Sequence, residues 1–186
     1  MPTSRMPAAA AVNTCDFCDQ QTDAIARGDV RALPPVFRHY GRQGHFFGKV
    51  ATVQCFEDNS LVRASLEQAG MARVLVIDGG ASLRHALLGG QLAALALRNG
   101  WAGVVIDGCV RDVQEIQASA LGVRALGSMP VPPRKLGSGQ CDVPVRIQGV
   151  PVRPGEWLYA DADGILVSRQ PLHGGDADPD IDLPAP

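Results

Sequence analysis

An arginine and an aspartate stand side by side in the middle of the chain, at Arg111 and Asp112, downstream of two adjacent glycines, Gly89 and Gly90. A guanidinium donates two directed hydrogen bonds to the oxygens of a small acid and keeps its charge at any working pH. A carboxylate can hold a hard divalent cation. The amides of a helix that starts at the glycines can receive an anion. Together these groups could bind a small acid and stabilise the negative charge that develops on it during a reaction.

The segment between these two pairs predicts the elements that position them. Apolar residues recur at helical spacing over 91–99, and Gly100 ends this helix. Residues 104–106 are a continuous apolar run, typical of a strand buried on both faces, with 74–77 as its parallel neighbour. Both strands are predicted to end in Asp-Gly. The arginine and the aspartate then fall just past the second strand, where open α/β sheets bind their ligands.

Each of these residues also has a purely structural interpretation. Glycine-bounded helix and strand units are common in proteins that bind nothing there, and a neighbouring Arg and Asp usually form a solvated pair. A further helix is predicted over 113–120, with Asp112 at or near its N-cap and Gly122 as its stop. The aspartate could therefore serve only as a helix cap.

The rest of the chain predicts further helices and strands. Helices are expected over 14–26, with Thr14 as N-cap, and over 61–69. A strand is expected over 46–55, and a short amphipathic segment over 81–88. The proline-rich last third predicts short antiparallel strands over 143–147, 149–152, 157–159 and 165–167, with a turn at 161–164. We therefore expect an α/β protein with a mostly parallel piece and a separate antiparallel piece.

Composition limits the size and the partners of the protein. With 186 residues, 46% of them hydrophobic, the chain is long enough for one well-buried domain, expected over 14–172, between disordered segments at 1–13 and 173–186. The net charge of −2 offers no basic face, so we expect no direct binding to nucleic acid. No apolar run approaches the roughly 20 residues that span a bilayer, so no membrane partner is expected.

Several other chemistries are not supported by the residues present. The five cysteines are odd in number and lie in unrelated contexts, which indicates a reducing cytosol, and Cys15 and Cys18 lack the partners of a zinc site. The glycine pairs match no nucleotide-binding motif. The two lysines, Lys49 and Lys135, lie outside the site motif, which argues against a Schiff base.

Longer motifs make the chain similar to a known family. They are NGW-x-G-x-V-I-x-G-x-V-R-D at 99–112, CFEDNSLVR at 55–63, RVLVIDGGASLRHALLGG at 73–90 and LYADADGILVS at 158–168. This pattern resembles the RraA-like family, which includes 4-hydroxy-4-methyl-2-oxoglutarate aldolases and the regulator of ribonuclease E activity, and it extends from about Thr14 to Leu172. The resemblance implies a swivelling β/β/α domain, with mixed sheets and flanking helices, that assembles as a homotrimer.

The resemblance also implies roles for the site residues. In the aldolases of the family, the glycine loop and the arginine bind the substrate, and the following aspartate holds magnesium or manganese. Arg111 therefore corresponds to a substrate-binding and catalytic residue, and Asp112 to the metal ligand. The other expected substrate-binding residues are Gly89, Gly90, Gln91 and Leu92. One departure is that Gly90 stands where the aldolases have an acidic residue that helps to organise water and proton transfer.

The implied activity is that of a cytoplasmic, metal-dependent (class II) aldolase. It would cleave 4-hydroxy-4-methyl-2-oxoglutarate to pyruvate and decarboxylate oxaloacetate, because both reactions pass through pyruvate enolate. Asp78 and Asp107 lie near the site, but neither is identified as a general base. The alternative is a non-catalytic trimeric regulator that binds and inhibits ribonuclease E. An acidic residue at Asp112 favours the enzyme, because the regulators typically lack one there.

Overall fold

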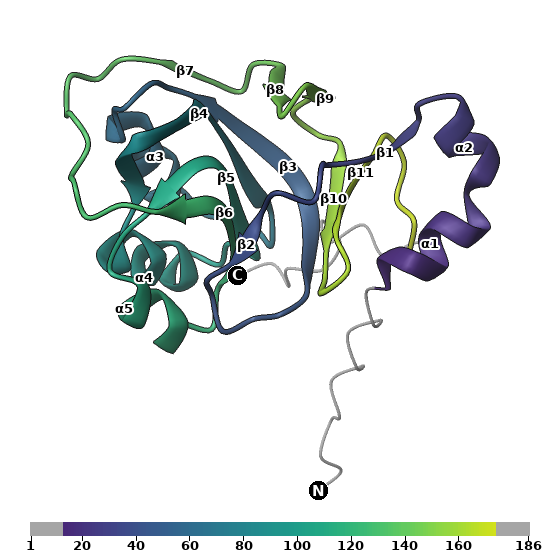
Figure 1. Ribbon diagram of the computed structural model, residues 1–186, viewed down its shortest axis with the longest axis horizontal. Coiled ribbons are helices and arrows are strands. Elements are labelled where there is room, and N and C mark those ends of the chain that lie inside the picture. The colour runs from purple at the N-terminus through teal and green to yellow at the C-terminus, as the bar shows by residue number, and fades with distance from the viewer. Residues whose placement is uncertain (1–12, 174–186) are drawn as a thin grey trace, which may run out of the picture.

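In the computed structural model, which describes residues 13–173, a mixed sheet of nine strands forms the centre of the protein (Figure 1). Its order is β1-β11-β10-β3-β4-β5-β6-β2, with β7 paired to β3 beside this path. The parallel strands are β3 (Phe46–Gln54), β4 (Val74–Leu88), β5 (Gly103–Val110) and β6 (Gly122–Ser128). The antiparallel strands at the other side are β10 (Trp157–Ala160), β11 (Ile165–Ser168) and β1 (Val30–Ala32).

The remaining strands are short. The strands β2 (Arg38–His39) and β7 (Gln140–Cys141) pair antiparallel with β6 and β3. A separate hairpin is formed by β8 (Val145–Ile147) and β9 (Val150–Val152). The short antiparallel strands expected in the last third are therefore confirmed.

The parallel and antiparallel parts are joined by β3, so the prediction of a separate antiparallel piece is wrong. The first part of β3, from Phe46 to Lys49, pairs antiparallel with β10. The second part, from Val50 to Gln54, pairs parallel with β4. The strand expected over 46–55 is therefore confirmed, and each of its ends has a different neighbour.

The two central strands also run further than predicted. Both continue past their Asp-Gly pairs, and the segment 81–88, expected to be a separate amphipathic segment, is the second half of β4. Register shifts separate the pairs Asp78↔Asp107, Ser82↔Gly108 and Ala86↔Cys109. These bulges absorb the extra residues of β4, so hydrogen bonding to β5 continues although the alternation of side chains is broken.

Two hydrophobic clusters cover the two faces of the sheet. Leu75 and Ile77 of β4 belong to the cluster that also contains buried residues of the helices α3 (Ser60–Leu66), α4 (Gly90–Arg98) and α5 (Val113–Ala118). Val74 and Val76, which alternate with them, belong to the cluster that contains the β8–β9 hairpin. The three helices lie together beside the parallel strands (Figure 1). Burial on both faces explains the continuous apolar runs in the sequence.

The N-terminal segment forms two helices instead of the one expected over 14–26. They are α1 (Thr14–Gln20) and α2 (Thr22–Ala26), and Gln21 between them leaves the helical conformation. Asn13, not Thr14, is the N-cap of α1, because its side chain accepts a hydrogen bond from the amide of Asp16. Asn13 and His173, which the sequence analysis assigned to the two terminal segments, are therefore placed by the structure. The rest of those predicted segments lies outside the described residues.

Within residues 13–173, no helix is long and apolar enough to cross a bilayer.

Candidate active site

The candidate site is built where the end of β4 meets the end of β5. The amide of Arg111 donates a hydrogen bond to the carbonyl of Leu88 at 2.9 Å, which fixes the loop after β5 beside the glycines after β4. Gly89 is the N-cap of α4. The structure therefore brings together the two pairs of residues that the sequence separates by a helix and a strand.

The carboxylate of Asp112 lies over the start of α4. Its Oδ2 accepts a hydrogen bond from the amide of Gly90 at 3.2 Å and lies 3.5 Å from Nε of Arg111. A Cβ at Gly89 would lie 2.6 Å from the same Oδ2, so a larger residue there would displace the Asp112 carboxylate. No described residue forms a hydrogen bond to the other carboxylate oxygen, and that oxygen is therefore available to a ligand.

Asp112 occupies the N-cap position that the sequence predicted for the following helix, but its side chain does not cap that helix. Asp112 is the N-cap residue of α5, yet its side chain forms no capping hydrogen bond to that helix. Its backbone is left-handed, with φ of 55°, a conformation that aspartate and asparagine adopt more readily than most residues. The side chain is thereby directed to α4, and both Arg111 and Asp112 remain partly exposed, with 40% and 38% of their side-chain surface accessible.

The first amides of α4 supply the predicted anion-binding groups. The Gly90 amide is already bonded to Asp112. Gln91 and Leu92 follow it in the first turn, where amides have no partner inside a helix. The Leu92 side chain is buried in the core, so only its backbone could contact a substrate. These two amides are the ones suited to a substrate carboxylate.

Glu115 is a site residue that the sequence analysis missed. It lies in the first turn of α5, and its side chain packs against Gly90: a Cβ at position 90 would lie 2.6 Å from the Glu115 Cβ and 2.7 Å from its carboxyl carbon. The spacing Asp112-x-x-Glu115 was the available signal, because residues three apart lie on the same side of a helix. A carboxylate therefore reaches the position where Gly90 itself supplies none.

An open cavity of about 400 Å³ adjoins this end of α4. Gly90, Gln91 and Glu115 form one part of its wall. The other lining residues are Ala94, Leu95, Arg63 and Arg98. Arg111 and Asp112 do not line this cavity, which shares Gly90, Gln91 and Glu115 with the candidate site and continues along α4.

The chemistry of the donors fits a hard divalent cation with few protein ligands. Asp112 and Glu115 offer carboxylate oxygens, and within residues 13–173 no group of three or more His, Cys, Asp or Glu residues is arranged to hold a metal. Magnesium usually binds through one or two carboxylates and keeps several waters. The residues present are suited to that type of site and not to a closed zinc site.

Asp78 of β4 and Asp107 of β5 have structural roles. Asp78 accepts hydrogen bonds from the Gln54 side chain and from the amide of Gly80. Asp107 is buried and accepts a hydrogen bond from the side chain of Gln148 at 2.7 Å. Burial raises the pKa of Asp107, and the hydrogen bond from Gln148 offsets only part of that increase. Neither carboxylate contacts Arg111 or Asp112 in the structure.

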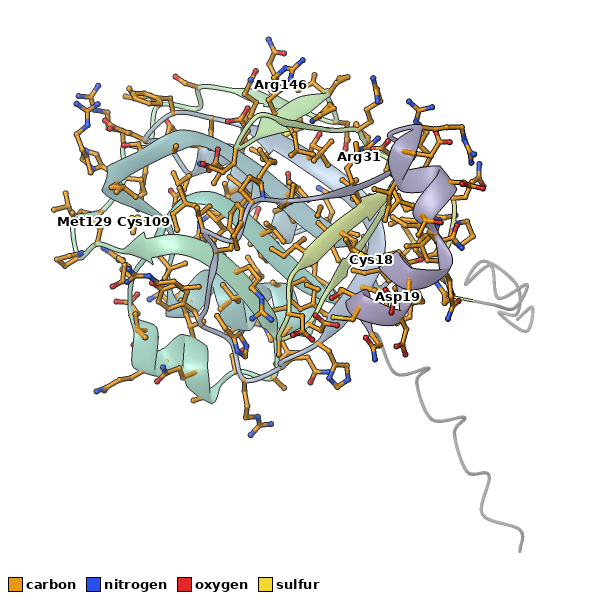
Figure 2. All side chains as sticks on the ribbon, turned by 45° about the vertical axis from the view of Figure 1, so that its right-hand side comes forward. Cys18, Asp19, Arg31, Cys109, Met129 and Arg146 are labelled. Atoms are coloured by element: carbon orange, nitrogen blue, oxygen red, sulfur yellow. The ribbon has the colours of Figure 1, made fainter. Side chains whose placement is uncertain are left out.

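The cysteine pair lies far from the site. Cys18 is on α1, at the opposite side of the molecule from Cys109 of β5 (Figure 2). Both Cys15 and Cys18 are free thiols. Nothing in their surroundings connects them to the chemistry at Arg111 and Asp112.

Comparison with known proteins gives consistent family matches. Residues 14–167 match the RraA-like family, described as Aldolase/RraA. A protein of Albidiferax ferrireducens, whose provisional name is 4-hydroxy-4-methyl-2-oxoglutarate aldolase, is 57% identical over 163 residues, which cover 83% of this chain and 94% of the relative. The resemblance indicated by the sequence motifs is thereby confirmed.

Two solved structures share the fold but have different names. The RNA-processing inhibitor RraA from Thermus thermophilis is 43% identical, with a TM-score of 0.82 over 91% of this chain and 98% of that one. An S-adenosylmethionine: 2-dimethylmenaquinone methyltransferase from Geobacillus kaustophilus is 44% identical, also with a TM-score of 0.82, over 88% and 99%. The predicted α/β fold is confirmed, whereas the names of the relatives do not agree on one activity.

Proposed function

Since the chain belongs to the RraA-like (Aldolase/RraA) family, we propose that it is a metal-dependent (class II) aldolase that cleaves 4-hydroxy-4-methyl-2-oxoglutarate to pyruvate. We propose that it also decarboxylates oxaloacetate, because both reactions pass through the enolate of pyruvate. One observation carries this proposal: Arg111, Asp112 and Glu115 converge on the N-terminus of α4.

Each group at this point has a role in binding or in charge stabilisation. The amides of Gln91 and Leu92 receive the carboxylate of the 2-oxo acid at the positive end of α4. The Arg111 guanidinium donates to the substrate oxygens and opposes the negative charge that develops as the enolate forms. Because the two amides belong to the backbone of α4, they require little reorganisation during the reaction.

Asp112 and Glu115 are the residues that would hold magnesium or manganese. When bound, such a cation supplies Lewis-acid polarisation of the substrate ketone. The Gly90 amide and the Arg111 guanidinium keep the Asp112 carboxylate oriented from one side through Oδ2. That arrangement leaves Oδ1 directed to other partners.

Gly90 does not weaken this proposal as much as the sequence suggested. The aldolases that the chain resembles have an acidic residue at this position, whereas here a carboxylate comes from Glu115 on the neighbouring helix. The absence of a side chain at Gly90 is what allows Glu115 to approach. We propose that Glu115 supplies the second carboxylate beside the cation and helps to order the water around it.

A second candidate function is supported by the likeness to the Thermus RNA-processing inhibitor. In that function the chain would act as a regulator that binds ribonuclease E without turning over a substrate. In either function we propose a homotrimer, as the family resemblance implies.

The proposed activity is tested with purified protein. Pyruvate release from 4-hydroxy-4-methyl-2-oxoglutarate and from oxaloacetate is measured with magnesium, with manganese and with a chelator. The aldolase proposal requires turnover that the chelator removes. If neither substrate is turned over with either metal, the proposal is wrong. Titration against ribonuclease E then tests the regulator, which requires inhibition at micromolar concentration.

A further inference from the structure

The cavity beside α4 has two chemically different ends. Gly90, Gln91 and Glu115 form the end at the candidate active site. Arg63 of α3 and Arg98 of α4 contribute guanidinium groups to the same cavity, with Ala94 and Leu95 between the two ends. A cavity with an anion-binding helix end and two arginines fits a ligand that has an acidic group at each end.

Arg98 belongs to the last turn of α4 yet reaches the same cavity as the first turn. It lies eight residues after Gly90, which corresponds to about 12 Å along the helix axis. Side chains of a helix tilt toward its N-terminus, so the Arg98 guanidinium is carried back toward the active-site end. The Arg98 side chain has no hydrogen bond or ion pair to any residue within 13–173, so its donors are available to a ligand.

Arg63 enters the cavity from the neighbouring helix. Its only ion pair among the described residues is with Glu67, four residues later, at 3.7 Å, and both side chains are about half exposed, at 48% and 53%. Exposed pairs of this type contribute little to stability. The pairing is therefore weak enough for Arg63 to turn to a carboxylate in the cavity.

We propose that Arg63 and Arg98 form a subsite for the distal carboxylate of a 2-oxo dicarboxylic acid whose pyruvyl end occupies the candidate active site. This inference rests on the proposed function and names the residues that would bind the second carboxylate of its dicarboxylic substrates. The two guanidinium groups outnumber the single carboxylate of Glu115 in the lining of the cavity, so a second negative charge is favoured there. A monocarboxylate such as pyruvate would leave this subsite empty.

The test compares two ligands that share the chelating end and differ at the other. Oxalate imitates pyruvate enolate and has no distal group, whereas 2-oxoglutarate carries a distal carboxylate. Dissociation constants for both are measured by calorimetry with magnesium present, for the wild-type protein and for Arg63→Gln, Arg98→Gln and the double variant. We expect each single variant to weaken 2-oxoglutarate binding about tenfold, the ratio that corresponds to about 1.4 kcal/mol, with much smaller changes for oxalate.

Two further variants separate the subsite from charge in general. Arg146→Gln removes an arginine from the β8–β9 hairpin (Figure 2). Arg146 does not line the cavity, so both affinities should be unchanged. Arg98→Lys keeps a positive charge at the end of α4 and should restore part of the 2-oxoglutarate affinity. The proposal is overturned if the arginine variants weaken both ligands equally, or if the wild type does not bind 2-oxoglutarate.

The result is independent of the aldolase assay. A protein without turnover whose affinity for 2-oxoglutarate depends on Arg63 and Arg98 would refute the proposed reaction and support the subsite. If the protein is active and its variants keep the wild-type preference between the two ligands, the proposed reaction is supported and the subsite is refuted.

Discussion

The side chain of Glu115 lies against the Cα of Gly90, so that a Cβ added at position 90 would lie 2.6 Å from the Cβ of Glu115. This contact links the first turn of α4 to the first turn of α5. It brings the carboxylate of Glu115 to the position where Gly90 has no side chain.

Gly90→Ala should destabilise the protein and lower turnover. The added methyl group meets not only the mobile end of Glu115 but also its Cβ, so α5 itself must shift. Overpacking of this kind costs about 1–3 kcal/mol. Unfolding by urea measures the loss. Adding Glu115→Ala should recover only part of the stability, because the Cβ of residue 115 remains; full recovery would show that the contact is confined to the carboxylate.

Glu115→Gln should leave the fold intact and reduce metal-dependent turnover. The amide has nearly the same shape, so its packing on Gly90 is kept, but it lacks the charge that attracts a hard cation. Magnesium titrations of oxaloacetate decarboxylation should show a higher half-saturating metal concentration. An unchanged metal dependence would restrict Glu115 to a structural role.

Asp112→Asn should keep nearly all of the stability, within about 0.5 kcal/mol, and abolish metal-dependent turnover. The asparagine can still accept the hydrogen bond from the Gly90 amide and tolerates a φ of 55°. Asp112→Ala should be less stable, because alanine in the left-handed region costs about 1–2 kcal/mol. Thermal unfolding and pyruvate release are measured on both variants. Near-wild-type decarboxylation by Asp112→Asn would contradict the mechanism and make the regulator the better conclusion.

Arg111→Lys should reduce turnover far more than metal affinity. Lysine supplies a point charge but not the paired, directed donors of the guanidinium. We expect a loss on the order of a hundredfold in turnover, as for removal of one oxyanion donor, with little change in the metal concentration required. Steady-state kinetics at several magnesium concentrations give both quantities. An equal loss in turnover and in metal affinity would show that Arg111 acts in metal binding.

The docking of α1 should weaken in acid through Asp161. Burial alone would raise the pKa of Asp161, but hydrogen bonds from the amide and hydroxyl of Thr14 and from the amides of Asp163 and Gly164 outweigh it and lower the pKa. A carboxyl whose pKa is lower in the folded state stabilises the fold above its unfolded pKa, about 4. That stabilisation is lost as the pH falls from about 4 through the lowered pKa.

Asp161→Asn tests this dependence. The variant should be less stable than the wild type at neutral pH, and the difference should shrink as the pH falls below about 4. The free energy of unfolding is measured in urea across that range. If the free energies of unfolding of the two proteins differ by the same amount at every pH, Asp161 is not the source of the pH dependence.

The sequence by itself determined the main elements around the site. Continuous apolar runs located the cores of β4 and β5, and the glycines located the ends of α4, because burial and helix termination leave local patterns. The same patterns placed Arg111 and Asp112 directly after β5. The short antiparallel strands of the last third were also predicted from local signals.

Only the tertiary structure decided which groups meet. The aspartate directs its carboxylate to α4 and not to the helix it precedes, and Glu115 fills the space that Gly90 leaves. The continuation of β4 through its bulges and the sharing of β3 between two strand directions are likewise decided by neighbouring strands. Residue periodicity reports burial within one element, whereas these contacts depend on the distance and rotation between elements, which the packing of the whole domain sets.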